Sequence, residues 1–369
     1  MANLLPSSAA EILADLTLLP NLESLIVRTP FVNGDSVDSD SEDNDSEDND
    51  SEDNDSGDSD SEDNESEWIA WFYDFEVGEG TEGIEERERA YGWRAIMSKS
   101  WDAIVQNKKS RVRSLESRQI VAKGVSTWTT QAFRDFLAPL DSFKISVRGY
   151  HNGAGWEQRI NTLYGYHDFL GSLGPTFFNH LPKVSVVSLH ASGYGPTGLE
   201  GTYHSLTPFE PNSIPLLKSL HLEYVFIDPP LVRFLSSHSQ TLESIMFTNC
   251  MTGIGSLAEN GIPWHNLFHA LLISSPPKLR IFEIQPLGVE DVGESDTRRY
   301  LDIEMTERAR QILEEDKTRR AFPYKKLDDK YGMLFADEHT SLEAFLEGKD
   351  QEAWDELMKV LRCNAEPSA

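Results

Sequence analysis

A short apolar pattern that recurs along the chain restricts the possible fold more than any other feature. Residues 242–250, Leu-Glu-Ser-Ile-Met-Phe-Thr-Asn-Cys, match the leucine-rich pattern L-x-x-L-x-L-x-x-N/C at every fixed position. The first half of that pattern returns elsewhere. The further copies lie at residues 22–27, 140–145, 184–189, 217–222 and 279–284, with a weaker copy at 112–115.

The spacing has a physical meaning. Alternate side chains of a strand point to opposite faces, so the last two apolar positions of each copy face the same side. The first apolar position precedes the strand and turns into the same core. One unit cannot bury this face alone, so the units must stack against one another.

Residues with one apolar helical face lie between these strands, and several such stretches end in a proline before the next strand. From residue 140 onward the copies begin 44, 33, 25 and 37 residues apart, whereas regular repeats hold roughly 20–29. We therefore expect an α/β fold: an irregular leucine-rich-repeat solenoid with short parallel strands and flanking helices, plus a helical C-terminal segment. The alternative is a generic α/β domain whose strands happen to begin with leucine.

An acidic tract interrupts the repeats at residues 35–67. It contains 18 acidic residues and no basic ones, with Ser-Glu-Asp-Asn-Asp repeated at 41–45, 46–50 and 51–55. Dense like charge with one apolar residue cannot offset the entropy of ordering, so we expect disorder. The chain then divides into a first helix-strand unit (1–34), this insert, a repeat region (68–287) and a helix-rich segment (288–369).

The charge balance limits the function classes. The net charge is −29, and a charge of −11 remains outside the acidic tract. We therefore do not expect nucleic-acid binding as the main activity. Two cysteines exclude a disulfide framework and favour the cytoplasm or the nucleus. No segment has the apolar length of a spanning helix, so we expect no membrane contact.

Three motifs suggest chemistry but fit structural roles better. Gly193–Gly198 spells G-x-G-x-x-G, but the prolines that follow argue against the helix that a dinucleotide site needs. His265 and His269 have zinc-binding spacing on an expected helix without a third ligand. Cys250 occupies the buried position of the repeat. No catalytic constellation is evident, so we expect neither an enzyme, a cofactor nor a metal.

Basic residues cluster at 108–113 and 317–326. A nuclear-import signal and a contact with the acidic tract are alternatives, but a solvated helix face is the preferred interpretation.

Several segments together resemble fungal F-box proteins with divergent leucine-rich repeats. They are Leu-Pro-Asn-Leu-Glu-Ser-Leu (19–25), Thr-Leu-Glu-Ser-Ile (241–245), Pro-Trp-His-Asn-Leu-Phe (263–268), Lys-Leu-Arg-Ile-Phe (278–282) and Leu-Asp-Asp-Lys-Tyr-Gly-Met-Leu-Phe (327–335). The resemblance implies that the repeats select a target protein for a ubiquitin ligase. It also implies an F-box that docks on a Skp1-type adaptor. No F-box is visible before Leu22, so either the protein is a relative without an F-box or the start codon lies downstream of a lost exon. Target binding by the repeats is expected in both cases.

The outward positions of the expected strands form the candidate binding surface. A protein partner lying across the strands would contact side chains between the inward positions. The candidate contacts are Lys144, His190, Ser219, His221, Glu223, Met246 and Glu283. The alternative is a histone-chaperone-like or chromatin-associated protein that binds a basic partner through the acidic tract, whose serines lie in the acidic context that suits phosphorylation.

Overall fold

The computed structural model describes residues 21–28, 80–107, 111–152, 158–198, 205–253, 261–285, 303–328 and 330–366, together with residues 12, 13, 15, 19, 78 and 201–203. The acidic insert and residues 68–77 lie outside them, so the disorder expected for residues 35–67 stays a prediction.

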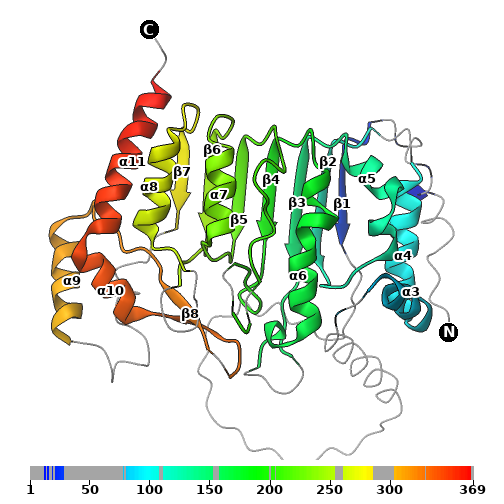
Figure 1. Ribbon diagram of the computed structural model, residues 1–369, viewed down its shortest axis with the longest axis horizontal. Coiled ribbons are helices and arrows are strands. Elements are labelled where there is room, and N and C mark those ends of the chain that lie inside the picture. The colour runs from blue at the N-terminus through cyan, green and yellow to red at the C-terminus, as the bar shows by residue number, and fades with distance from the viewer. Residues whose placement is uncertain are drawn as a thin grey trace, which may run out of the picture.

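A seven-stranded parallel sheet forms the centre of the molecule (Figure 1). Its strands lie side by side in the order in which they occur along the chain. They are β1 (Ser24–Arg28), β2 (Ser114–Ile120), β3 (Ser142–Val147), β4 (Val186–His190), β5 (Ser219–Glu223), β6 (Ser244–Thr248) and β7 (Ile281–Ile284). The expected α/β class with short parallel strands is therefore confirmed.

The register aligns equivalent positions of the apolar pattern in rows across the sheet. The second apolar positions form one row, which includes Phe143, Val187, Leu220 and Ile245. The third apolar positions form another, and from β3 to β7 the residues of both rows are almost completely buried. The first apolar positions, such as Leu140 and Leu217, are also buried just before their strands.

The residues immediately before the strands repeat the same backbone contact. The carbonyl oxygen of Glu243, for example, accepts the amides of Arg280 and Ile281 from the next strand. Glu23, Arg113, Asp141, Ser185 and Lys218 occupy the equivalent position and accept two amides each. The side-chain charges in this row alternate in sign, apart from Ser185, and Lys218 Nζ lies 3.1 Å from Glu243 Oε1.

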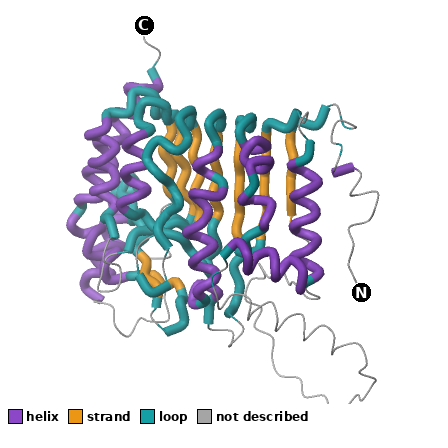
Figure 2. Tube along the Cα trace, turned by 45° about the vertical axis from the view of Figure 1, so that its right-hand side comes forward, coloured by secondary structure: helices purple, strands orange, loops and turns teal. Residues whose placement is uncertain are grey.

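Helices pack on one face of the sheet (Figure 1; Figure 2). Their apolar residues, such as Phe133, Phe169, Phe234 and Phe268, are buried in one core with the inward strand residues. From β2 onward the covering helices include α5 (Gln131–Leu137), α6 (Tyr164–Thr176), α7 (Pro229–Ser237) and α8 (Trp264–Ser274). Before β2 the chain forms α3 (Thr81–Ala90) and α4 (Gly92–Val105), which are separated by Tyr91.

Local sequence explains where two of these helices begin. The Asp228 carboxylate accepts the Leu231 amide at 2.8 Å, and Pro229 occupies the first position of α7. Both features are typical of helix N-termini, where the first backbone amides have no partner within the helix. The carboxylate accepts one of these amides, and proline has no amide N–H. Thr130 caps α5 in the same way through the Phe133 amide.

The C-terminal segment combines helices with a hairpin that the sequence did not predict. The helices are α9 (Ile303–Glu315), α10 (Glu338–Glu347) and α11 (Lys349–Ala365), and β8 (Lys325–Leu327) pairs with β9 (Leu334–Ala336) in an antiparallel ladder. Helix α11 packs beside α8. Trp354 and Phe322 contact Phe268 there, so this segment shares the main core.

The structure corrects one interpretation in this segment. Residues 317–320 follow the end of α9 and do not form a solvated helix face. The Arg319 guanidinium lies over Phe345, and that of Arg320 lies over Trp354, at 5.2 and 5.1 Å from the ring centres. Both guanidinium groups lie over aromatic rings, a use of arginine that a charge count alone does not reveal.

Candidate protein-binding face

The second face of the sheet carries none of the described helices (Figure 2). We call it the open face. The outward residue at the middle of each strand lies on it in one continuous row, with partners fixed by the strand register. The row reads Ile26, Glu116, Lys144, Ser188, His221, Met246 and Glu283.

Two rows flank this middle row. Towards the carboxyl ends of the strands lie Arg28, Arg118, Ser146, His190, Glu223 and Thr248. Towards the amino ends lie mostly serines, with Val186 and Ile281 as the apolar exceptions. Parallel sheets normally bury both faces. An accessible face with mixed polar and apolar side chains is therefore an unusual surface.

Polar side chains at the centre of the open face form a connected cluster across β4, β5 and β6. His190 Nδ1 donates to the Glu223 carboxylate at 3.1 Å, and His190 Nε2 lies 3.3 Å from His221 Nδ1. On its other side, His221 Nε2 lies 3.0 Å from Thr248 Oγ1. Beneath the two rings is the nearly buried Ser188, whose hydroxyl lies 2.6 Å from His190 Nε2.

The surroundings favour the neutral form of both imidazoles. Burial lowers the pKa of His190, and Glu223 opposes part of that change. Burial and the neighbouring His190 lower the pKa of His221. The ammonium group of Lys144 acts in the same direction on both rings.

Charge is distributed unevenly along the open face. Three cationic side chains and one carboxylate lie on β1 to β3, namely Arg28, Arg118, Lys144 and Glu116. The carboxylates of Glu223 and Glu283 lie on β5 and β7. Within the first group, Arg118 Nε donates to Glu116 Oε1 at 2.6 Å, and this hydrogen bond lowers the pKa of Glu116.

Every predicted contact residue lies on the open face. Lys144, Met246 and Glu283 are exposed, whereas Ser219, His221, Glu223 and His190 are half-buried. The structure brings His190, His221 and Glu223 into direct contact and leaves Lys144 and Glu283 at opposite sides of them.

Sequence reasoning missed the β1 and β2 part of this face. Glu116 and Arg118 follow the weakest copy of the pattern, in which Ser117 occupies the third apolar position. The pattern predicts an apolar residue at position 117, so the serine there makes β2 hard to recognise from the sequence. The exposed apolar side chains of Ile26, Val186 and Ile281 were also missed, although their alternation with inward residues could have revealed them.

The glycine motif forms a loop without a helix in the described residues, as expected. Gly195 packs against Tyr166, whose hydroxyl donates to the Gly195 carbonyl at 3.1 Å, and a Cβ at Gly195 would lie 2.4 Å from the Tyr166 oxygen. Gly198 has φ +98°, a conformation that suits glycine. Close packing and backbone conformation therefore account for both glycines.

The two helical histidines and Cys250 have structural surroundings. His265 donates through its backbone amide and through Nδ1 to Asp350 Oδ1 at 2.9 and 2.8 Å, which ties α8 to α11, whereas His269 is exposed. Cys250 Sγ donates to the Leu222 carbonyl at 3.3 Å. Burial raises the pKa of the Cys250 thiol to about 12.

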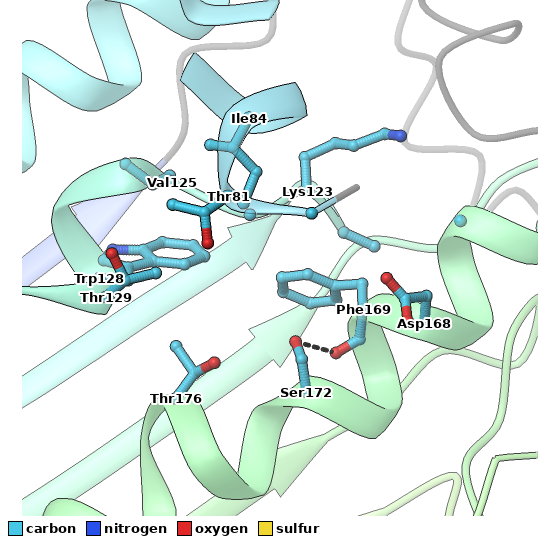
Figure 3. A pocket seen from close by; sticks show the side chains of 14 residues that line it. Thr81, Ile84, Lys123, Val125, Trp128, Thr129, Asp168, Phe169, Ser172 and Thr176 are labelled. Carbon is cyan, nitrogen blue, oxygen red and sulfur yellow. Dashed lines mark hydrogen bonds between the residues drawn. The ribbon is translucent and has the colours of Figure 1, made fainter. Parts of the chain in front are cut away.

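A cavity of about 240 Å³ lies among α3, α6 and the segment after β2 (Figure 3). Trp128 and Phe169 line it, and Ser172 beside them donates to the Phe169 carbonyl at 2.7 Å. None of the predicted contact residues lines this cavity.

Among the described residues, no group of three or more His, Cys, Asp or Glu side chains is placed to hold a metal ion. None of the described helices is long and apolar enough to cross a membrane. Comparison with known proteins found no matching family model, no matching curated protein and no matching solved structure.

Proposed function

We propose that this chain is an irregular leucine-rich-repeat solenoid that binds another protein across its open face. The single observation that carries the proposal is the open face itself, a seven-strand surface with register-aligned rows of polar and apolar side chains. A stack of repeats presents such a surface as one continuous binding strip.

The repeated backbone contact supports the solenoid. Each residue that precedes a strand from β1 to β6 offers its carbonyl to two amides of the next unit, although the loops between strands differ greatly in length. A generic α/β sheet has no reason to repeat one contact in strict chain order. Crossovers that always lead to the neighbouring strand are the topology of stacked units.

The surface chemistry favours a protein over a nucleic acid. Its cationic end on β1 to β3 is matched by an acidic end on β5 to β7, so a uniformly negative polymer would be repelled by half of it. Exposed Met246 and Ile281, at 38% and 48%, offer apolar contact near the acidic end. The partner is therefore a protein surface that is acidic where it meets Lys144 and basic where it meets Glu283.

The resemblance to F-box proteins suggests a use for this binding. A target receptor of a ubiquitin ligase grips its substrate through the repeats and contributes no reaction of its own. The proposed activity is accordingly selective binding without catalysis.

The second candidate is binding of a basic protein by the acidic tract. Eighteen carboxylates in residues 35–67 favour it. In that case the open face is dispensable and the tract is essential, which makes the two functions separable in one experiment.

The test compares captured proteins across four versions of the chain. The face variant combines Lys144→Glu with Glu283→Lys, and its matched control combines Arg233→Glu with Glu356→Lys on exposed parts of α7 and α11. The fourth version lacks residues 35–67. Captured proteins are identified by mass spectrometry, and the affinity of the leading one is then measured with purified components.

We expect a partner that binds the parent, the control and the deletion but binds the face variant at least tenfold more weakly. Equal binding by the face variant and its control would contradict the proposal. Loss of binding in the deletion alone would favour the acidic tract instead.

A further inference from the structure

We propose that His190 and His221 make the open face a proton-sensitive surface, which binds its partner at neutral pH and releases it in mildly acidic solution. This inference concerns the regulation of the open face and rests on the proposed function. The two histidines lie 31 residues apart in the sequence, on the adjacent strands β4 and β5. Only the strand register brings them together, so a local motif does not predict the pair.

The two imidazole rings face each other at short range. His190 Nε2 lies 3.3 Å from His221 Nδ1, and the ring centres are 4.7 Å apart at an interplanar angle of 71°. The Ser188 hydroxyl lies 2.6 Å from His190 Nε2 and 3.4 Å from His221 Nδ1. A neutral imidazole has one donor and one acceptor nitrogen, so the protonation state decides whether this arrangement is favourable.

The neutral pair fits this geometry. His190 Nδ1 donates to Glu223, so His190 Nε2 is an acceptor and receives the Ser188 hydroxyl proton. His221 Nδ1 carries a proton that points to His190 Nε2, and the Thr248 hydroxyl donates to His221 Nε2. In this state the hydrogen bonds run in one direction through the cluster, and the two rings do not oppose donor to donor.

The same geometry accepts one added proton more easily than two. Protonated His190 keeps its bond to Glu223 and donates through Nε2 to His221, whose own proton then lies on Nε2 and is accepted by Thr248. If His221 is protonated as well, two N–H donors and two positive charges face each other across 3.3 Å. The two titrations are therefore coupled, and the doubly protonated rings must move apart.

Charged groups on neighbouring strands act on the pair in both directions. The carboxylates of Glu223 on β5 and Glu116 on β2 favour protonation of His190, whereas the ammonium group of Lys144 on β3 opposes it. Glu223 and Lys144 act in the same two directions on His221.

Burial is the largest influence on both rings and lowers both pKa values. The other side chains that face the rings, Ser188 on β4 and Met246 and Thr248 on β6, carry no charge. The pair is therefore mainly uncharged at pH 7 and titrates below the ordinary histidine value of about 6.5.

Protonation changes the part of the open face that a partner has to cover. A partner that covers the two half-buried rings removes more of their water, and this desolvation disfavours the charged form. Protonated His190 also offsets the charge of Glu223, which belongs to the acidic end that meets the basic part of the partner. A partner that binds the neutral pair better than the charged pair is released when the pair takes up protons.

The first test is an NMR titration of the histidine ring protons in the free full chain. We expect His190 and His221 to titrate in separate steps, both below about 6.5. His190→Gln should raise the pKa of His221, because the charge of His190 lowers it. Glu223→Gln should lower the pKa of His190, and Lys144→Gln should raise both pKa values. His269→Gln, at an exposed position of α8, is the matched control and should move neither.

The stability of the free chain gives an independent check. Because folding lowers both pKa values, the unfolded chain takes up protons at a higher pH than the folded chain. The contribution of the neutral pair is fully present above about pH 6.5 and is lost as the pH falls through the folded pKa values. The midpoint of urea unfolding should therefore fall more between about pH 7.5 and about pH 5.5 in the parent than in the double variant His190→Gln with His221→Gln.

The second test measures the affinity of the leading partner from the capture experiment at the same two pH values. We expect about five- to tenfold weaker binding at the lower pH, which corresponds to a further pKa decrease of up to about one unit on binding. The double variant should lose most of this pH dependence, whereas His269→Gln should keep it.

The inference fails if the two histidines titrate independently of each other, or if the double variant keeps the pH dependence of binding. It also fails if acidification tightens binding in the parent. Its failure is distinguishable from that of the proposed function, because the coupled titration is measured without a partner and the capture experiment is performed at neutral pH.

Discussion

The two faces of the seven-stranded sheet are made by the same strands but differ in what surrounds them. On the covered face, side chains such as Leu220 and Leu222 are fully buried against helices. On the open face, neighbouring residues of the same strand, such as Ser219 and His221, keep contact with solvent. Because alternate positions separate the two roles, the covered face can maintain the fold while the open face changes its chemistry.

The largest expected effect on stability comes from truncating a side chain of the covered face. Leu220→Ala should destabilise the protein by about 2–5 kcal/mol, because it removes buried methyl groups and leaves a cavity in a packed core. Ser219→Ala, one residue away on the open face, should change stability by less than about 0.5 kcal/mol. Urea unfolding followed by circular dichroism measures both, and equal losses would contradict the distinction between the faces.

The cap of a covering helix should have the next largest effect. The buried Asp228 carboxylate accepts the Thr207 and Leu231 amides, both at 2.8 Å, and the Thr207 hydroxyl at 2.7 Å. Asp228→Ala leaves these donors without that acceptor and should cost about 2–3 kcal/mol. Thr130→Ala, at the cap of α5, should cost about 1 kcal/mol. A smaller loss of stability for Asp228→Ala than for Thr130→Ala would contradict a stabilising contribution from the two hydrogen bonds that Thr207 donates to Asp228.

Ser117 is a polar residue on the covered face. Its hydroxyl is buried without a hydrogen-bond partner. Ser117→Ala should therefore stabilise the protein by about 1 kcal/mol, since it removes a desolvated group that makes no bond. Ser142→Ala on the open face serves as the reference and should be nearly neutral. Destabilisation by Ser117→Ala would show that the hydroxyl contributes to packing.

The smallest expected effect is the pH dependence of an open-face pair. Arg118 lowers the pKa of Glu116 in the folded protein, so the pair contributes stability above the unfolded pKa of about 4.3. That contribution disappears as the pH falls through the lower folded pKa. We expect Arg118→Gln to raise the Glu116 pKa towards its ordinary value in a carboxyl-detected NMR titration. An unchanged Glu116 pKa would mean that Arg118 does not control it.

The apolar pattern predicted most of the sheet because the pattern and the strand obey the same period of two. The inward rows from Phe143 to Phe282 and the buried first positions such as Leu217 follow directly from it. At β2 it gives only the weak copy at 112–115, because Ser117 replaces an apolar residue, and it failed at the hairpin of β8 and β9, which has only three residues in each strand. Short elements and polar substitutions carry too little periodic signal to be recognised.

Seven residues of the candidate face were predicted on β3 to β7, but their arrangement was not. Alternation alone places Lys144, His221 and Glu283 outward. It does not say which residues of different strands are neighbours, because the loops between strands vary in length. The contact of His190 with His221, and of both with Glu223 and Thr248, depends on the register.

The sequence by itself determined the α/β class, the positions of most strands and the side of each strand that is buried, since these depend on local periodicity and hydrophobic burial. Only the tertiary structure decided which outward side chains meet, how Arg320 and Trp354 pack, and where two imidazole nitrogens lie 3.3 Å apart. A side-chain contact between distant residues depends on strand register and helix packing, and a local sequence pattern specifies neither of them.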